Sequence, residues 1–78
     1  MDRTALELVR IIEHSDDKRR CRDAGNTLIG ILPSLDDYSI DDVTRDMSDI
    51  ITYSKDEQRR RVAQDVLITF KNAHSVFV

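Results

Sequence analysis

Basic side chains form two short clusters in this sequence, and both clusters could bind phosphate. They consist of Lys18, Arg19, Arg20 and Arg22, and of Arg59, Arg60 and Arg61. Lysine and arginine neutralise the phosphates of nucleic acids, and such binding weakens steeply as the salt concentration rises. A second interpretation is a set of ion pairs on a solvated helix, because an arginine stands four residues from each of Asp56, Glu57 and Asp65. We favour the ion pairs, since the chain carries a net charge of −3.

Aspartates dominate the stretch between the two basic clusters. Asp42, Asp46 and Asp49 are spaced so that they share one face of a helix. A calcium-binding loop requires alternating ligands and a turn glycine, and neither is present in this stretch. We therefore expect neither a metal ion nor a cofactor. The stripe is then either a solvated outer face or the binding surface of an inhibitor.

The remaining reactive side chains do not form a catalytic set. Cys21 stands at an apolar position of its predicted helix, which indicates a buried thiol. A cysteine nucleophile requires a base and an orienting group, but His14 and His74 are both expected at helix ends. Paired catalytic carboxylates, glycine-rich phosphate loops and serine triads are also absent from the sequence. We therefore expect a protein that is not an enzyme.

The composition is that of one small globular domain over residues 1–78. Hydrophobic residues make up 40% of the chain and charged residues 35%, a balance that argues against disorder. No apolar run approaches the ~20 residues needed to span a bilayer, and the beginning of the chain lacks the pattern of a secretory signal. The single cysteine fits a reducing compartment. We expect a cytoplasmic protein with no membrane contact.

Apolar residues recur with helical spacing in four stretches, which predicts an all-α domain of three or four helices. Serine or threonine begins each predicted helix, and in the first and last it opens a capping box that ends in a glutamate. The last two helices should form an antiparallel hairpin. The apolar end, Ser75–Val78, either extends the final helix or lies free. The expected helices run from Thr4 to about His14, from Ser15 to Pro33, from Ser39 to Ser54, and from Ser54 beyond Phe70.

Gly25 stands in the middle of the second predicted helix, on the same side as Cys21 and Leu28. A glycine at such a position costs about 1 kcal/mol relative to alanine, but it allows a neighbouring element to come close. Glycine and asparagine also suit a helix end, so Gly25-Asn26 offers an alternative boundary. We favour a continuous helix.

The first helix carries more apolar surface than one neighbour can cover. Its apolar residues span roughly 220° of the helix surface, about twice what a surface helix needs. It is therefore either enclosed within the monomer or shared with a partner, and in so short a chain we favour a homodimer. Ile68 points away from the apolar stripe of its own helix and indicates a further contact. The predicted interface residues are Leu6, Val9, Ile11, Ile12 and Ile68.

From Leu28 onward, the order of apolar and charged positions resembles a known family. The pattern is Leu28-x-x-Ile31-Leu32, Ser39-Ile40-x-x-Val43-x-x-x-Met47-x-x-Ile50-Ile51, Asp56-Glu57-x-x-Arg60-Arg61 and Val66-Leu67-x-x-Phe70. It is similar to the enterobacterial YmgB/AriR family of biofilm and acid-resistance regulators, also called two-component connectors. The resemblance implies a dimeric all-helical protein that modulates a signalling protein and can associate with DNA. It implies no catalytic residues.

Three functions are consistent with these patterns. We favour a small non-enzymatic regulatory or adaptor protein that binds a second regulatory protein and acts as a helical homodimer. The first alternative is a small helical dimer that binds nucleic acid through Arg19, Arg20, Arg22, Arg59, Arg60 and Arg61. The second is a phage or bacterial inhibitor that uses its acidic face.

Overall fold

Four α-helices and one short 3₁₀ turn form the computed structural model, which describes the backbone of residues 2–76 and the side chains of residues 2–73. The predicted all-α class is therefore confirmed. The final helix takes in Ser75 and Val76, whereas Phe77 and Val78 and the side chain of His74 lie outside the described residues. The elements are α1 (Arg3–His14), α2 (Lys18–Ile31), a 3₁₀ turn (Leu32–Ser34), α3 (Asp37–Tyr53) and α4 (Glu57–Val76).

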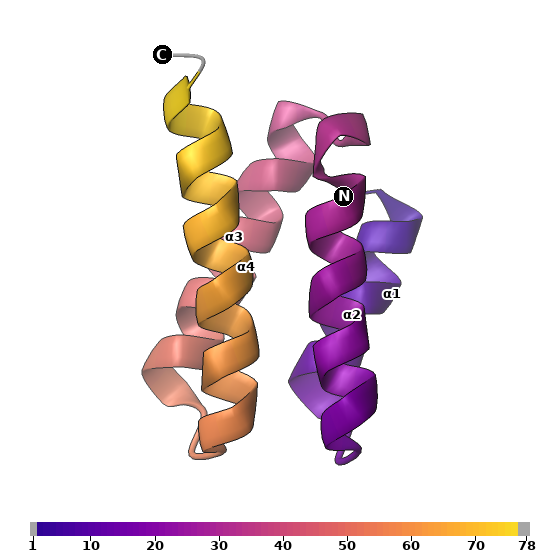
Figure 1. Cartoon of the computed structure of the whole chain (residues 1–78), viewed down its shortest axis with the longest axis vertical. Coiled ribbons are helices and arrows are strands. Elements are labelled where there is room, and N and C mark those ends of the chain that lie inside the picture. The colour runs from indigo at the N-terminus through magenta and orange to yellow at the C-terminus, as the bar shows by residue number, and fades with distance from the viewer. Residues whose placement is uncertain (1, 77–78) are drawn as a thin grey trace.

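The helices pack as two hairpins, α1 with α2 and α3 with α4, as expected for the second pair (Figure 1). α2 also packs against α4, and α1 touches α3. In Figure 1, α2 and α4 form the front layer and α1 and α3 lie behind them. Because the hairpins are antiparallel, α2 and α4 begin at the same end of the bundle where α1 and α3 finish.

Aspartates cap the starts of α1 and α3, in place of the predicted Thr4 and Ser39. The Asp2 carboxylate accepts a hydrogen bond from the Ala5 backbone N–H at 3.1 Å. Asp36 accepts one from the Ser39 N–H at 2.8 Å. Both predicted caps were wrong because an upstream aspartate is an equally good cap, and its ionised oxygen makes the stronger hydrogen bond. α1 therefore begins one residue earlier than expected, and α3 begins two residues earlier.

The start of α4 also differs from the prediction. Ser54 caps the end of α3, where its backbone N–H donates to the Ile50 carbonyl. Asp56 takes the position at the start of α4, because its carboxylate accepts from the Arg59 N–H at 3.1 Å. The chain thus turns over three residues between the two helices, and the predicted meeting of both helices at Ser54 is corrected.

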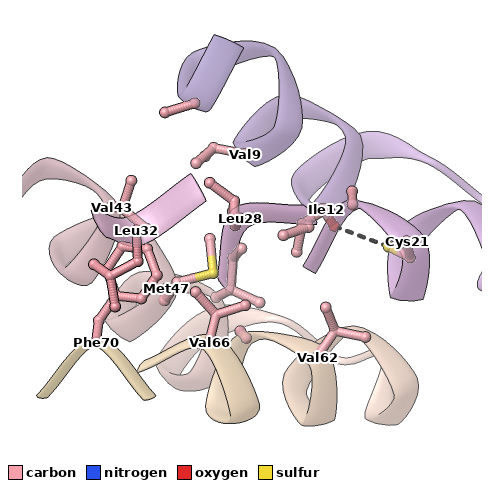
Figure 2. Packing of buried hydrophobic residues seen from close by; sticks show 14 residues of the cluster. Val9, Ile12, Cys21, Leu28, Leu32, Val43, Met47, Val62, Val66 and Phe70 are labelled. Atoms are coloured by element: carbon pink, nitrogen blue, oxygen red, sulfur yellow. Dashed lines mark hydrogen bonds between the residues drawn. The ribbon is translucent and has the colours of Figure 1, made fainter. Parts of the chain in front are cut away.

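The interior is one apolar cluster, to which all four helices contribute side chains (Figure 2). α1 packs against both α2 and α3, so two neighbours share its broad apolar arc. Val9 and Ile12 are 0% exposed, which corrects the prediction that they face a partner. The buried apolar residues are Ala5, Val9, Ile12, Cys21, Ala24, Leu28, Leu32, Val43, Met47, Ile50, Val62, Ala63, Val66 and Phe70.

Gly25 lies inside α2 at its contact with α4, and the helix runs through it without a break, as predicted. A Cβ atom added at Gly25 would lie 2.7 Å from Cγ1 of Val62. Cys21, one turn earlier, is buried, and its thiol donates to the Ile12 carbonyl at 3.4 Å. The absent side chain therefore allows α2 and α4 to approach closely.

Candidate functional site

Arg59 connects the start of α4 to the turn between α1 and α2. Its Nη2 donates to the Ser15 carbonyl at 2.5 Å, which satisfies an acceptor just beyond the end of α1. Its Nε is buried and has no hydrogen-bond partner among the described residues. The Arg59 side chain is therefore engaged within the fold rather than presented to a ligand.

The other two arginines of this triplet also have partners nearby. Arg61 forms the predicted ion pair with Glu57, at 3.1 Å from Nη2 to Oε1. Arg60 bonds instead to the Ser54 carbonyl, with 2.8 Å between Nη1 and the oxygen, so its predicted pairing with Asp56 is replaced. The three consecutive arginines thus point to three different partners and do not form one phosphate-binding surface.

The basic residues of α2 remain exposed, and they lie near the start of α4. Lys18 and Arg61 line one open hollow, together with the side chains of Asp56, Glu57 and Gln58. One residue from each of the two basic clusters therefore lies at the same hollow within a single molecule. The pKa of Asp56 lies below its ordinary value, chiefly because its carboxylate accepts the Arg59 backbone hydrogen bond. We define the basic face by Lys18, Arg19, Arg22 and Arg61, all of which are exposed.

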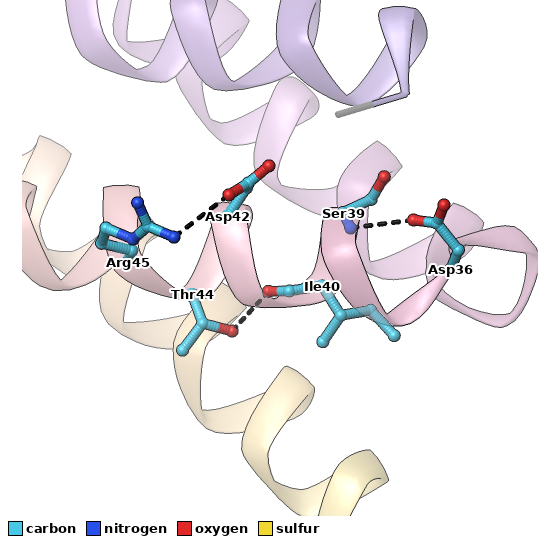
Figure 3. A network of polar contacts seen from close by, with 6 residues as sticks. All are labelled: Asp36, Ser39, Ile40, Asp42, Thr44 and Arg45. Carbon is cyan, nitrogen blue, oxygen red and sulfur yellow. Dashed lines mark hydrogen bonds and ion pairs between the residues drawn. The ribbon is translucent and has the colours of Figure 1, made fainter.

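The aspartate stripe of α3 lies on the opposite layer of the bundle. Asp42 pairs with Arg45 at 3.2 Å (Figure 3). Among the described side chains, neither Asp46 nor Asp49 forms an ion pair. The pKa of Asp46 is raised, first by burial and then by the neighbouring charges of Asp42 and Asp49. The stripe therefore holds like charges that its own chain does not fully compensate.

A second open hollow lies where α1 and α3 end. Carboxylates of both helices line it, together with His14, Tyr53 and Arg59 of α4. Partial negative charge at a helix C-terminus favours cations, and two such termini meet here. Within residues 2–73, no group of three or more acidic, histidine or cysteine side chains is arranged to hold a metal ion. We define the acidic face by Glu13, Asp42, Asp46, Asp49 and Tyr53.

Two tyrosines on α3 are much more exposed than any other described large hydrophobic residue. Tyr38 is 82% exposed in the first turn of the helix, and Tyr53 is 78% exposed in its last turn. Neither tyrosine is among the residues predicted from the sequence to form a site. Their position off the apolar stripe of Val43, Met47 and Ile50 was the available signal.

The remaining predicted interface residues do not form a single surface. Leu6 and Ile11 on α1 are partly buried, and Ile68 on α4 is 49% exposed. Figure 1 shows α1 at the rear and α4 at the front of the bundle, on opposite sides. With Val9 and Ile12 in the core, the homodimer prediction depends on these three separated side chains.

Comparisons with known proteins identify no family for this chain. No protein-family model, curated protein or solved structure matches the chain, so the resemblance to the YmgB/AriR family stays a prediction. None of the helices within the described residues combines the length and apolar character needed to span a membrane.

Proposed function

We propose that this chain is a small non-enzymatic regulatory or adaptor protein that acts by binding other proteins through its acidic face. The observation that carries the proposal is the pair of exposed tyrosines on α3. Tyr38 and Tyr53 are 82% and 78% exposed on a helix whose charged residues are mostly aspartates. Tyrosine is enriched in protein interfaces because it combines a large apolar ring with a polar tip. The surrounding carboxylates favour a partner with a basic surface.

Partner capture with point variants tests this proposal. Tagged wild type and a Tyr38→Ala/Tyr53→Ala variant are incubated with lysate at moderate salt, and the retained proteins are identified by mass spectrometry. The control is Ile68→Ala, an exposed apolar residue on α4. We expect one or more proteins that wild type and the control retain and the tyrosine variant loses. Identical sets for all three proteins, or no retained protein, would contradict the proposal.

The meeting of Lys18 and Arg61 supports a second candidate, the binding of nucleic acid at the start of α2 and α4. Two acids line the same hollow, and Arg59 and Arg60 already bond within the chain, so this candidate ranks second. Filter binding with duplex DNA and RNA at low salt tests it. Binding should fall steeply as salt rises. An absence of binding at protein concentrations on the order of 10 µM would remove this candidate.

The resemblance to the YmgB/AriR family supports a regulatory role, because it implies a dimeric protein that modulates a signalling protein. It rests on positions between Leu28 and Phe70, most of which the structure places in the core or at helix starts. Such positions determine the fold more than the partner. The exposed tyrosines of α3 therefore carry the proposal, and the resemblance adds to it.

A further inference from the structure

We propose that copies of this chain associate front to back, with the basic face of one molecule against the acidic face of the next. The inference rests on the proposed function, because it uses the same acidic face and names a second copy as one occupant of it. It differs from the homodimer predicted from apolar residues, since charged faces on opposite layers make the contact.

The two faces belong to helices in opposite layers of the bundle. The basic face belongs to α2 and α4, which form the front layer in Figure 1, and the acidic face belongs to α1 and α3 behind them. Both hollows lie at the same end of the bundle, where α2 and α4 begin and α1 and α3 finish. A displacement along the shortest dimension, 16 Å, therefore brings the basic face of one copy toward the acidic face of the next.

The side chains of the two faces are complementary in charge. Asp46 and Asp49 have no ion pair among the described residues, and they are directed into the acidic hollow beside Tyr53. Arg19 and Arg22 are exposed on α2 and have no ion pair in the described part of the chain. A guanidinium group can approach these carboxylates and also pack on the tyrosine ring. The raised pKa of Asp46 is consistent with this, because a nearby cation relieves repulsion among the aspartates.

The geometry determines the kind of assembly. A contact between two different faces is heterologous, so it forms an open stack rather than a closed two-fold dimer. The average size should therefore grow with protein concentration. Exposed charges are screened within about 8 Å at physiological ionic strength, so the association should weaken as salt is added.

Charge reversal on each face gives a test in which two defects correct each other. One variant is Asp46→Lys/Asp49→Lys, and the other is Arg19→Glu/Arg22→Glu. Each variant presents two faces of like charge and should not associate with itself. An equimolar mixture should associate, because every contact between unlike variants is again complementary. The control is Asp41→Lys, an exposed residue about 140° around α3 from Asp46.

Sedimentation velocity at low and at high salt gives the readout, and far-UV circular dichroism confirms that each variant is folded. We expect wild type and the control to exceed the 9.0 kDa monomer mass at low salt and to return to it at high salt. A monomeric wild type at low salt, association unaffected by salt, or a mixture that stays monomeric would each overturn the inference. Self-association without tyrosine-dependent partner capture would refute the proposed function alone. Partner capture by a protein that never self-associates would refute this inference alone.

Discussion

At the scale of single residues, the close contact between α2 and α4 depends on a missing side chain. Gly25 faces Val62, and a Cβ atom there would be only 2.7 Å from Cγ1. Val62 is buried and short, so it cannot move aside at low cost. The second glycine of α2, Gly30, has no atom within 4 Å of such a Cβ position. A side chain at Gly25 would therefore clash with a core residue, whereas a side chain at Gly30 would meet open space.

Replacing each glycine by alanine should change stability in opposite directions. Gly25→Ala introduces overpacking that costs roughly 1–3 kcal/mol, partly offset by about 1 kcal/mol of helix propensity. Gly30→Ala should gain up to about 1 kcal/mol, because only the propensity term acts. Urea denaturation measures both free energies of unfolding, and Gly25→Ala/Val62→Ala should lose less through overpacking. Equal effects of the two single substitutions would refute this account.

At the scale of the helix, α3 holds two aspartates in opposite environments. The environment of Asp36 at its start favours the charged carboxylate, and that of Asp46 in its middle disfavours it. The side chain of Ser39, and then its backbone N–H, hydrogen-bond to Asp36 and hold its pKa below the ordinary value of 3.8. Burial and the like charges on the same face raise the pKa of Asp46 above that value. The two aspartates should therefore give the stability of this protein opposite pH dependences.

Removal of the charge at Asp46 should stabilise the protein at neutral pH. Because the folded state binds the Asp46 proton more tightly than the unfolded state, stability from this group falls as pH rises through its folded pKa. Asp46→Asn should then raise the unfolding free energy at about pH 7, and the gain should disappear below about pH 3.8, where both states are protonated. Thermal unfolding followed by circular dichroism across this range measures the difference.

The matched control is Asp36→Asn, for which the sign reverses. The folded pKa of Asp36 is lowered, so its contribution is present above 3.8 and is lost as pH falls through the folded pKa. The substitution should therefore reduce stability at neutral pH and have little effect in acid. The same sign for both variants would contradict the opposite shifts.

At the scale of the whole molecule, the bundle buries one side of its own first helix. Ala5, Val9 and Ile12 are all 0% exposed, although the apolar arc of α1 had suggested a partner. Arg59 adds a link from α4 to the end of α1, across 44 positions of sequence. A single copy thus buries part of the apolar arc on which the homodimer prediction was based, whereas Leu6 and Ile11 are only partly buried.

A monomer that folds on its own should have a melting temperature that does not depend on protein concentration. Binding that favours the folded state raises the apparent stability by mass action, so an obligate dimer melts higher at higher concentration. At high salt, where contacts between charged faces are screened, Tm should stay constant over a roughly hundredfold range of concentration. Scanning calorimetry and circular dichroism cover this range. A steady rise in Tm would mean that the core requires a second copy.

The sequence by itself determined the local structure of this protein. Helical spacing predicted the helices and the side of α2 on which Gly25 lies. Apolar residues recur with the period of the helix on the face that is buried, so their spacing identifies that face. The caps were harder to predict, since Asp2, Asp36 and Asp56 compete with nearby hydroxyl residues for the same backbone donors. The separation of acidic from basic stretches was also visible in the sequence.

Only the tertiary structure decided which surfaces are buried and which faces oppose each other. The apolar arc of α1 has the same sequence pattern whether α3 or a second chain covers it. The partner of Arg59 is a backbone carbonyl far away in the chain, and no local period indicates it. The placement of acids behind and bases in front follows from the order of helices around the bundle. That order depends on contacts between residues far apart in the sequence, whereas residue spacing indicates only which residues share a face of one helix.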